Sequence, residues 1–317
     1  MKLLVTGGAG YIGSHVVSEA LSAGHQVVVV DDLSTGVPNR LDDSIELADL
    51  NLASPDAQAK LSELISRTGT EAVIHLAARK QVGESVEKPE EYYRDNIGGL
   101  ANLLLAMRET KVDAMVFSSS AATYGMPDVD SVRESDALSP INPYGQTKLI
   151  GEWMIENAKF WGLRGVSLRY FNVAGTGAAG LSDTAALNLI PIAIGQLRRG
   201  ETPKVFGDDY PTPDGSCIRD YVHVSDLARA HVAALDYLER PSREHAVFNV
   251  GTGTGASVFE VLNVLREVSG IDFEPEIAPR RAGDPPKLVA NVARIEQALG
   301  FRAEKSLAEI IDSAWNL

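Results

Sequence analysis

The chain has 317 residues, of which 44% are hydrophobic and 23% charged, and its formal net charge is −14. This composition is typical of a globular protein with one large α/β unit or two modest domains. The acidic balance argues against a nucleic-acid binder, because a phosphate backbone needs a basic surface. The single cysteine, Cys217, excludes an intrachain disulfide. With no recognisable targeting segment and no apolar stretch near the ~20 residues that span a bilayer, we expect a cytoplasmic protein without membrane contacts.

Short apolar runs alternate with longer amphipathic segments through the first half of the sequence. The runs are rich in Val, Ile, Leu or Phe and are bounded by turn or polar residues, which predicts strands buried on both faces of a parallel sheet. The amphipathic segments between them predict helices. The expected strands are Lys2–Thr6, Gln26–Val30, Ala72–Leu76, Ala114–Ser118, Val166–Tyr170 and Val247–Gly251, and the expected helices are Tyr11–Ala23, Ala57–Thr68, Glu90–Glu109 and Tyr144–Trp161.

The alternation ends near Gly175, after which Gly, Pro and acidic residues predict loops through Gly175–Asp183 and Gly207–Gly215. We therefore expect an α/β protein with a doubly wound parallel sheet and a smaller C-terminal α/β lobe that holds the substrate. The larger domain is expected to comprise residues 1–174 plus about 222–251, and the smaller lobe about 175–221 plus 252–317.

A glycine-rich turn follows the first expected strand directly. The sequence Gly7-Gly8-Ala9-Gly10-Tyr11-Ile12-Gly13 lies between that strand and the first expected helix. Glycines let the main chain turn tightly and approach a pyrophosphate, and the N–H groups at the helix start favour its negative charge. A glycine pattern alone is weak evidence, but in this position it predicts a dinucleotide site of the Rossmann type, with contacts from Gly7, Gly10, Tyr11, Ile12 and Gly13.

Asp31 follows the second expected strand, at the ~20-residue distance at which such sites carry an acidic residue. A carboxylate there accepts hydrogen bonds from both ribose hydroxyls of NAD and repels the 2′-phosphate of NADP. No arginine follows in the run to Gly36, so NAD is the predicted cofactor. The alternative is a solvated Asp in a loop.

Tyr144 and Lys148 are four residues apart, which places both on one face of a helix. A Tyr with its ordinary pKa is only ~0.1% ionised at pH 7. A nearby ammonium and the positive nicotinamide ring both favour the phenolate, so Tyr144 can act as a base near neutral pH. The Tyr-x-x-x-Lys pattern is common by chance, but after a dinucleotide motif it predicts a catalytic pair.

Three consecutive serines, Ser118 to Ser120, come at the end of the strand that begins at Ala114. Ligands of doubly wound sheets bind beyond the carboxyl ends of the strands. A hydroxyl there can both donate to and accept from a sugar hydroxyl. We expect Ser120 to be the third catalytic residue, with Ser119 as the alternative, and a plain structural role for all three serines stays open.

With these motifs the sequence resembles the extended short-chain dehydrogenase/reductase family, and within it the enzymes that invert C4 of a UDP-hexose. The resemblance extends over most of the sequence in order, which argues against an accidental match. It runs through Gly7–His15, His75–Pro89, Ser118–Gly125, Tyr144–Lys148, Arg169–Asn172, Phe206–Val224 and Arg280–Asp284.

The resemblance implies further contacts to both ligands. Arg219 and Arg281 would hold a diphosphate by charge-assisted hydrogen bonds, and Phe206 would pack on a uracil ring. Alternatively, Phe206 belongs to the core and the arginines pair with Asp208, Asp209 or Asp220. The implied NAD contacts include Asp49, Leu50, Lys80, Asn96 and Tyr170 together with Tyr144 and Lys148. The implied UDP-sugar contacts are Asn172, Asn188, Leu189, Phe206, Arg219, Arg281 and Asp284 together with Ser120 and Tyr144. No metal is expected.

The resemblance also implies a reaction that converts UDP-galactose to UDP-glucose without net oxidation. Tyr144 would take the proton of the C4 hydroxyl while C4 gives its hydride to NAD. The 4-keto sugar would then turn about its diphosphate linkage and be reduced on its other face. Related dehydratases need an acid–base carboxylate pair just after the serine, and decarboxylating relatives need a Glu. This protein has Ala121 and Ala122 there, whose methyl groups cannot transfer protons, so elimination is not expected.

Two alternatives remain at this point. The substrate could be another nucleotide sugar, such as UDP-GlcNAc, a UDP-uronate or a UDP-pentose. The protein could also be a non-catalytic NAD sensor, although a sensor needs no Tyr–Lys–Ser set. The family pattern often has Tyr near the position of Leu288, and the smaller side chain leads us to expect some UDP-GlcNAc turnover.

A homodimer is also implied, because in relatives the helices equivalent to Glu90–Glu109 and Tyr144–Trp161 form the interface. The apolar residues Leu100, Leu103, Leu104, Trp153 and Phe160 suit that role, but core packing explains them equally well.

Overall fold

The structure is a computed structural model that describes residues 1–240, 245–281 and 283–316. The polypeptide folds into two compact units. Unit 1 comprises Met1–Thr123, Pro140–Arg169 and Ala228–Phe248, and unit 2 comprises Tyr124–Ser139, Tyr170–Leu227 and Asn249–Leu317. In the part of the sequence that is described, no helix combines the length and the apolar composition needed to cross a membrane.

A seven-stranded sheet forms the centre of unit 1, with the strand order β10-β6-β5-β4-β1-β2-β3. The pairs β1–β2, β1–β4, β2–β3 and β4–β5 are parallel. The order reverses at β1 and β4, which is the switch point of a doubly wound sheet, so the expected fold class is confirmed. The strands are β1 (Lys2–Thr6), β2 (Gln26–Asp31), β3 (Glu46–Asp49), β4 (Ala72–His75), β5 (Ala114–Ser120), β6 (Arg164–Tyr170) and β10 (Ala246–Val250).

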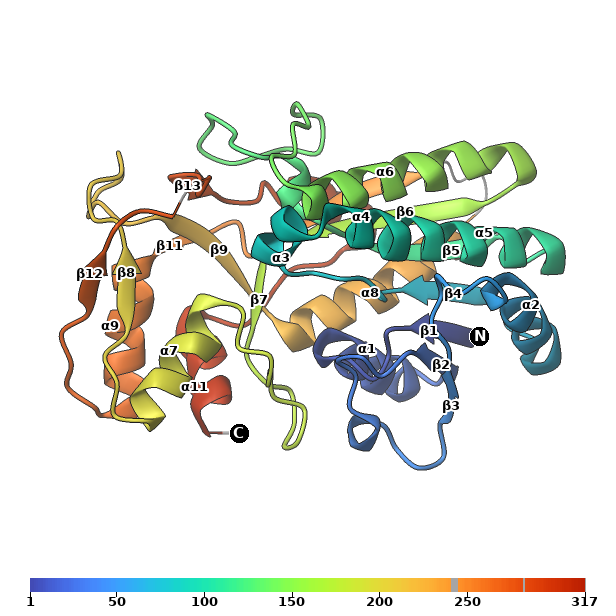
Figure 1. Ribbon diagram of the computed structural model, residues 1–317, viewed down its shortest axis with the longest axis horizontal. Helices are drawn as coiled ribbons and strands as arrows, with labels where there is room; N and C mark the ends of the chain where they lie inside the picture. The colour runs from blue at the N-terminus through green and yellow to red at the C-terminus, as the bar shows by residue number, and fades with distance from the viewer. Residues whose placement is uncertain (241–244, 282, 317) are drawn as a thin grey trace. The chain divides into compact units, whose positions relative to one another are not determined.

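Helices cover both faces of this sheet (Figure 1). The helices α5 and α6 run side by side along one face, and α1 lies on the other. Parallel strands require such crossover helices, which explains why the strands read as nearly continuous apolar runs. The helices of this part are α1 (Tyr11–Ser22), α2 (Ala57–Thr68), α3 (Val82–Glu87), α4 (Pro89–Tyr92), α5 (Gly99–Thr110), α6 (Pro143–Ala158) and α8 (Val224–Glu239), with short 3-10 turns at Pro38–Arg40, Ala121–Thr123 and Lys159–Trp161.

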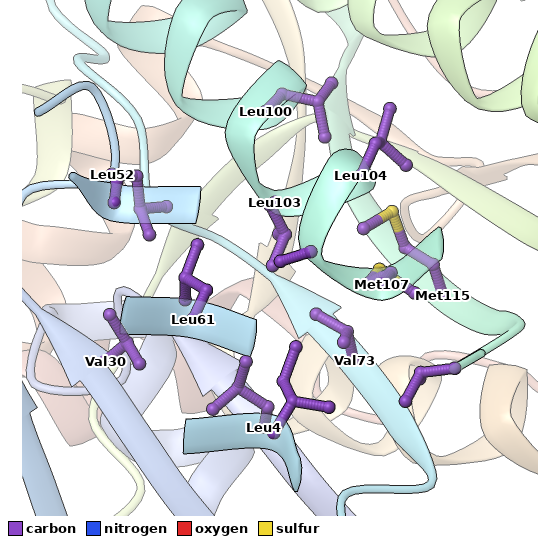
Figure 2. Close-up of a cluster of buried hydrophobic side chains, with 14 of the residues drawn as sticks. Leu4, Val30, Leu52, Leu61, Val73, Leu100, Leu103, Leu104, Met107 and Met115 are labelled. Carbon is purple, nitrogen blue, oxygen red and sulfur yellow. The ribbon is translucent and has the colours of Figure 1, made fainter. Parts of the chain in front are cut away.

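A core of Leu, Val and Met side chains joins α2 and α5 to this sheet. Figure 2 shows Leu61 of α2 and Leu103 of α5 facing Leu4 and Val73 of the strands. All four are fully or almost fully buried, and burying one such side chain stabilises a fold by about 1.5–3 kcal/mol. The edge strand β3 was not expected, because its residues are half-buried or exposed and its sequence, Glu46–Asp49, is half acidic.

The expected helix Glu90–Glu109 is wrong as a single regular helix. It consists of α4, a π-helical turn (η2, Tyr93–Gly98) and α5. A π-helical turn contains one more residue than an α-helical turn, and side-chain contacts can stabilise it. Asn96 within this turn is buried and bonded to two other segments. Apolar periodicity does not report such an insertion, so the sequence predicted the helical segment without its irregular turn.

Unit 2 contains two small sheets and a layer of helices. Strand β9 (Ile218–His223) pairs with β11 (Gly255–Ser257), β13 (Lys287–Leu288) and β7 (Asn172–Ala174), and β8 (Lys204–Phe206) pairs with β12 (Glu276–Ala278). The helices α7 (Leu189–Arg198), α9 (Val258–Ser269) and α11 (Leu307–Asn316) share a core with Tyr221 of β9. The remaining helix is α10 (Ala293–Leu299).

Tyr124–Ser139 and Tyr170–Leu227 belong to unit 2, whereas the sequence grouped residues up to 174 with the first domain. The assignment of NAD to one domain and of the nucleotide sugar to the other stays a prediction. Ala282, which belongs to the expected Arg280–Asp284 motif, lies outside the described residues.

Candidate active site

The glycine turn has the shape that a dinucleotide needs. Gly7 has φ +73°, a conformation that favours glycine, and a Cβ there would come within 2.7 Å of the Ala77 nitrogen. A Cβ on Gly13 would come within 2.0 Å of the Gly7 carbonyl oxygen. Helix α1 begins at Tyr11, and its N-cap residue, Gly10, has no side chain that could cover the first turn. The turn therefore requires glycine at Gly7 and Gly13, and no side chain of Gly10 covers the start of α1.

Asp31 holds this turn from the end of β2. Its Oδ2 accepts a hydrogen bond from the Ala9 N–H and its Oδ1 accepts one from the Leu33 N–H, both at 3.0 Å. Each carboxylate oxygen keeps a second lone pair for a ribose hydroxyl. Burial is the main cause that raises the pKa of Asp31. Asp49 lies directly opposite Asp31 in the β2–β3 register, and the Leu50 N–H donates to the Asp31 carbonyl at 3.1 Å.

The other implied NAD contacts lie on neighbouring segments. Lys80 is exposed in the segment between β4 and α3, and Asn96 is buried in the π-helical turn. Both N–H groups of the Asn96 amide are already used, by the Arg79 carbonyl and the Thr147 hydroxyl, at 3.0 Å each. Tyr170 is the last residue of β6. Apart from Tyr144 and Lys148 of α6, the expected NAD residues of unit 1 therefore lie at the carboxyl ends of β1 to β4 or, for Asn96, are bonded to the segment after β4.

Helix α6 carries the expected catalytic pair. Its first turn is fixed by Pro143 and by Asn142, whose side chain accepts from the Gly145 N–H at 2.8 Å. Tyr144 and Lys148 lie one turn apart, both buried, with the Lys148 Nζ 5.9 Å from the centre of the Tyr144 ring. The Lys148 Nζ also donates to the Ser118 carbonyl at 2.7 Å. The structure thus brings Tyr144, Lys148 and the end of β5 together.

The three serines at the end of β5 have three different partners. The Ser118 hydroxyl bonds to His231 Nε2 at 2.8 Å, and the Ser119 hydroxyl donates to Glu152. The Ser120 hydroxyl accepts from the Ala122 N–H at 3.1 Å, lies close enough to Tyr144 to lower its pKa, and is the most exposed of the three, at 9% against 0% for the other two. Ser119 is therefore committed to the interior, and Ser120 is the serine whose hydroxyl is available beside Tyr144.

Glu152 lies one turn beyond Lys148 in α6 and is paired inside the protein. Arg169 donates to both of its carboxylate oxygens, at 2.9 and 2.6 Å. Both side chains are almost completely buried. Glu152 thereby links β6, which carries Arg169, to Ser119, the residue next to Ser120. Glu152 was not expected from the sequence, although the same four-residue spacing that joins Tyr144 to Lys148 also joins Lys148 to Glu152.

Burial dominates the proton affinities at this site. It lowers the pKa of Lys148 to about 7, and the Glu152 carboxylate partly offsets that effect. Burial raises the pKa of Tyr144, whereas the Ser120 hydrogen bond lowers it. Burial and the neighbouring Lys148 lower the pKa of His75 to about 3, so this side chain is neutral. The polypeptide alone therefore does not produce the low Tyr pKa expected from the sequence, because desolvation outweighs the effect of Ser120.

Apart from Ser120 and Tyr144, the implied sugar residues lie in unit 2. Arg219 of β9 pairs with Asp284 at 3.3 Å, and Leu288 of β13 lies opposite Arg219 in the parallel register. The Arg281 guanidinium covers the Phe206 ring at 3.8 Å from its centre. Asn188 precedes Leu189, the first residue of α7, and its amide donates to the Val173 carbonyl at 3.3 Å. Asn172 is in β7, beside Tyr221 of β9.

The sequence left Asp208, Asp209 and Asp220 open as alternative partners of Arg219 and Arg281. Two of these aspartates have other partners in the structure. Asp209 pairs with Arg280 instead. Asp220 is buried and accepts hydrogen bonds from the Thr252 and Gly253 N–H groups. Ala121 and Ala122 lie in the 3-10 turn after Ser120, so the two positions that follow Ser120 carry no ionisable group.

Comparison with known proteins agrees with this geometry. The model of the NAD dependent epimerase/dehydratase family matches residues 3–251. The UDP-glucose 4-epimerase of Corynebacterium glutamicum is 47% identical over 320 residues, which cover 99% of this chain and 95% of that protein.

Solved structures give the same result. The UDP-glucose 4-epimerase of Stenotrophomonas maltophila, crystallised with NAD and formylated UDP-arabinopyranose, has a TM-score of 0.94 at 36% identity, over 99% of this chain and 97% of that one. The enzyme from Brucella ovis, in complex with NAD, has a TM-score of 0.93 at 42% identity, with the same coverage. The resemblance read from the sequence is confirmed: the chain belongs to the NAD dependent epimerase/dehydratase family.

Proposed function

We propose that this protein catalyses the C4 epimerisation of a UDP-hexose, converting UDP-galactose to UDP-glucose with NAD as its cofactor. The observation that carries the proposal is the set of Tyr144, Lys148 and Ser120 with no carboxylate after the serine. Relatives that are 40–47% identical to the protein along nearly its full length are UDP-glucose 4-epimerases. Bound NAD takes the hydride from C4 and returns it to the opposite face of the same carbon.

The protein's own residues move the proton and hold the sugar. Tyr144 removes the proton of the C4 hydroxyl and later returns it, so it serves as base and as acid. The Ser120 hydroxyl, which lowers the pKa of Tyr144, can exchange hydrogen bonds with the same sugar oxygen. Lys148 places a positive charge beside the Tyr144 ring, which favours the phenolate.

Unit 2 supplies the groups that suit the nucleotide part of the substrate. Arg219 and Arg281 are cations in a protein of net charge −14, and guanidinium groups bind diphosphates well. Arg219 is mostly buried and shares its charge with Asp284. We propose that Phe206, Asn172, Asn188 and Leu189 complete this site. A grip on the diphosphate rather than on the hexose leaves the sugar free to turn.

The test is to supply the protein with UDP-galactose and to follow the appearance of UDP-glucose by separation of the two sugars. UDP-GlcNAc, a UDP-uronate and a UDP-pentose are supplied in parallel. Preferred conversion of UDP-galactose supports the proposal. Preference for one of the other sugars identifies a different epimerase, and no conversion of any sugar agrees with a non-catalytic NAD-binding protein.

We also propose that the protein forms a homodimer through α5 and α6. Leu100, Leu103 and Leu104 belong to the core, but Trp153 of α6 is 52% exposed and Phe160, in the turn after it, is 85% exposed. Exposed large apolar side chains on one helical segment are typical of an interface. A second copy of the protein would cover them. Light scattering should give twice the mass of one copy, and Phe160→Glu with Trp153→Glu should give the monomer. The cytoplasmic location stays a prediction.

A further inference from the structure

Lys80 lies in the middle of a short segment, Arg79–Gln81, that other side chains hold on both sides. The segment follows β4 and precedes α3, and it has no regular secondary structure. Lys80 is exposed. Its two neighbours, in contrast, have both their backbone N–H and their backbone carbonyl groups bonded to side chains from the following helical segments.

Asn96 holds the first neighbour. Its Oδ1 accepts from the Arg79 N–H at 2.8 Å, and its Nδ2 donates to the Arg79 carbonyl at 3.0 Å. The same Nδ2 donates to the Thr147 hydroxyl in α6 at 3.0 Å. The backbone of Arg79 is therefore tied to the helix that carries Tyr144 and Lys148.

Tyr92 holds the second neighbour. Its hydroxyl accepts from the Gln81 N–H at 2.9 Å. Its single proton has two acceptors, the Gln81 carbonyl at 2.7 Å and the Glu84 carboxylate at 3.0 Å. Tyr92 is fully buried, so this hydroxyl is fixed in place, and the Gln81 backbone is fixed with it.

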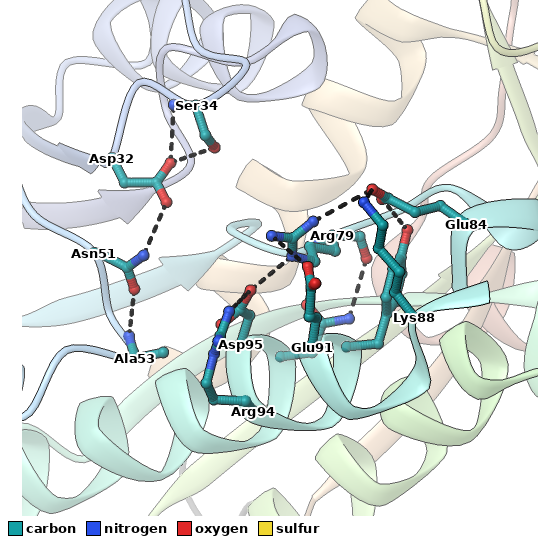
Figure 3. A network of polar contacts seen from close by, with 12 residues as sticks. Asp32, Ser34, Asn51, Ala53, Arg79, Glu84, Lys88, Glu91, Arg94 and Asp95 are labelled. Atoms are coloured by element: carbon teal, nitrogen blue, oxygen red, sulfur yellow. Dashed lines mark hydrogen bonds and ion pairs between the residues drawn. The ribbon is translucent and has the colours of Figure 1, made fainter. Parts of the chain in front are cut away.

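The Arg79 side chain ties the segment to the same helical segments (Figure 3). Its guanidinium pairs with Asp95 at 2.6 Å, Glu91 at 3.1 Å and Glu84 at 3.5 Å. These carboxylates come from η2, α4 and α3, and Glu84 is also an acceptor of Tyr92. The Arg79 guanidinium thus connects the Arg79–Gln81 segment to three successive helical elements.

We propose that Arg79 and Tyr92 are positioning residues that hold Lys80 ready for an anionic or ribose oxygen of NAD. The inference rests on the proposed function, in which Lys80 contacts NAD. When the backbone on both sides of a lysine is already ordered, binding fixes only the side chain, and less conformational entropy is lost. NAD then dissociates more slowly than it would from a mobile segment. Slow dissociation suits a reaction in which the cofactor is reoxidised at every turnover.

The experiment measures the rate at which labelled NAD leaves the holoprotein during a chase with unlabelled NAD. Arg79→Met and Tyr92→Phe should each accelerate dissociation about tenfold, the effect of one or two lost hydrogen bonds. The matched controls are Arg94→Met, which also loses a pair with Asp95, and Tyr93→Phe, the neighbouring tyrosine, whose hydroxyl bonds to Gln146. Both should change the rate less than twofold.

The decisive variants combine each change with Lys80→Met. If Arg79 and Tyr92 act through Lys80, Lys80→Met accelerates dissociation and the second change adds no more than twofold. Full multiplication of the two effects, or equal effects of Tyr92→Phe and Tyr93→Phe, overturns the proposal. An unchanged rate for Lys80→Met also overturns it, because Lys80 then makes no contact that slows the dissociation of NAD. These rates do not depend on UDP-hexose turnover, so failure of the proposed function is detected separately.

Discussion

Lys148 donates a hydrogen bond of 2.7 Å to the backbone carbonyl of Ser118. This bond joins α6, which carries Tyr144, to β5, which carries Ser120. Tyr144 and Ser120 are the two residues that are proposed to touch the sugar. It also aims the lysine away from solvent, so the ammonium is buried and its pKa falls to about 7. The same side chain therefore sets the geometry of the site and makes it sensitive to pH.

The first prediction separates Ser120 from Ser119. Ser120→Ala should lower kcat by about 10²-fold, the typical cost of one hydrogen-bond donor at a reacting oxygen. It should also raise the apparent pKa of Tyr144, because the Ser120 hydrogen bond lowers it. Ser119→Ala, the matched control, removes a bond to Glu152 and should chiefly lower the free energy of unfolding. Equal losses of kcat in the two variants would contradict the assignment.

The second prediction concerns the charge of Glu152. Because this carboxylate raises the pKa of Lys148, Glu152→Gln should lower it further, and the alkaline limb of the kcat/KM profile should move to lower pH by about one unit. The control is Glu156→Gln, one turn further along α6, where Glu156 pairs with Lys159 at the surface. Profiles are normalised to folded protein, since Glu152→Gln leaves Arg169 unpaired. An unmoved alkaline limb would show that Glu152 has only a structural role.

The third prediction concerns the free-energy cost of burying the Lys148 side chain. Its ordinary pKa of 10.5 falls to about 7 in the fold, so the unfolded protein binds the extra proton between these values. The fold gains stability as the pH rises through this window, and the penalty is complete below pH 7. Lys148→Met removes the penalty. Its free energy of unfolding relative to the parent should be higher at pH 6 than at pH 9 by about 2–3 kcal/mol, as measured by urea denaturation. A difference that does not change with pH would refute a depressed pKa.

Much of this site could be predicted from the sequence, because its key contacts are local. The glycine turn lies within seven residues, and Tyr144 and Lys148 are one helical turn apart. The hydrogen bonds that hold the backbone on both sides of Lys80 could not be predicted, since they depend on where the π-helical turn and the helix before it place Asn96 and Tyr92. The choice among the three serines likewise needed the structure, because neighbouring residues of a strand point to opposite faces and meet different partners. In unit 2, the stacking of Arg281 on Phe206 joins residues far apart in the sequence.

The fourth prediction concerns the acceptance of acetylated sugars. Leu288 lies opposite Arg219 in the β9–β13 register, beside residues proposed to hold the substrate. Leu288→Tyr adds volume there and should lower UDP-GlcNAc turnover at least about tenfold, a steric penalty of ~1.4 kcal/mol. UDP-galactose turnover in the same variant serves as the control and should change little. Equal UDP-GlcNAc rates for Leu288→Tyr and the parent would remove Leu288 from the determinants of specificity.

The central claim is that Tyr144 moves only a proton, while the C4 hydrogen would be held as a hydride by the bound cofactor and returned to C4. The most direct test supplies UDP-galactose carrying deuterium at C4, in ordinary water and with no added NAD, and measures the label in UDP-glucose by mass spectrometry. The account predicts full retention of deuterium at C4, and no product with Tyr144→Phe. Loss of the label to water, or undiminished conversion by Tyr144→Phe, would contradict it.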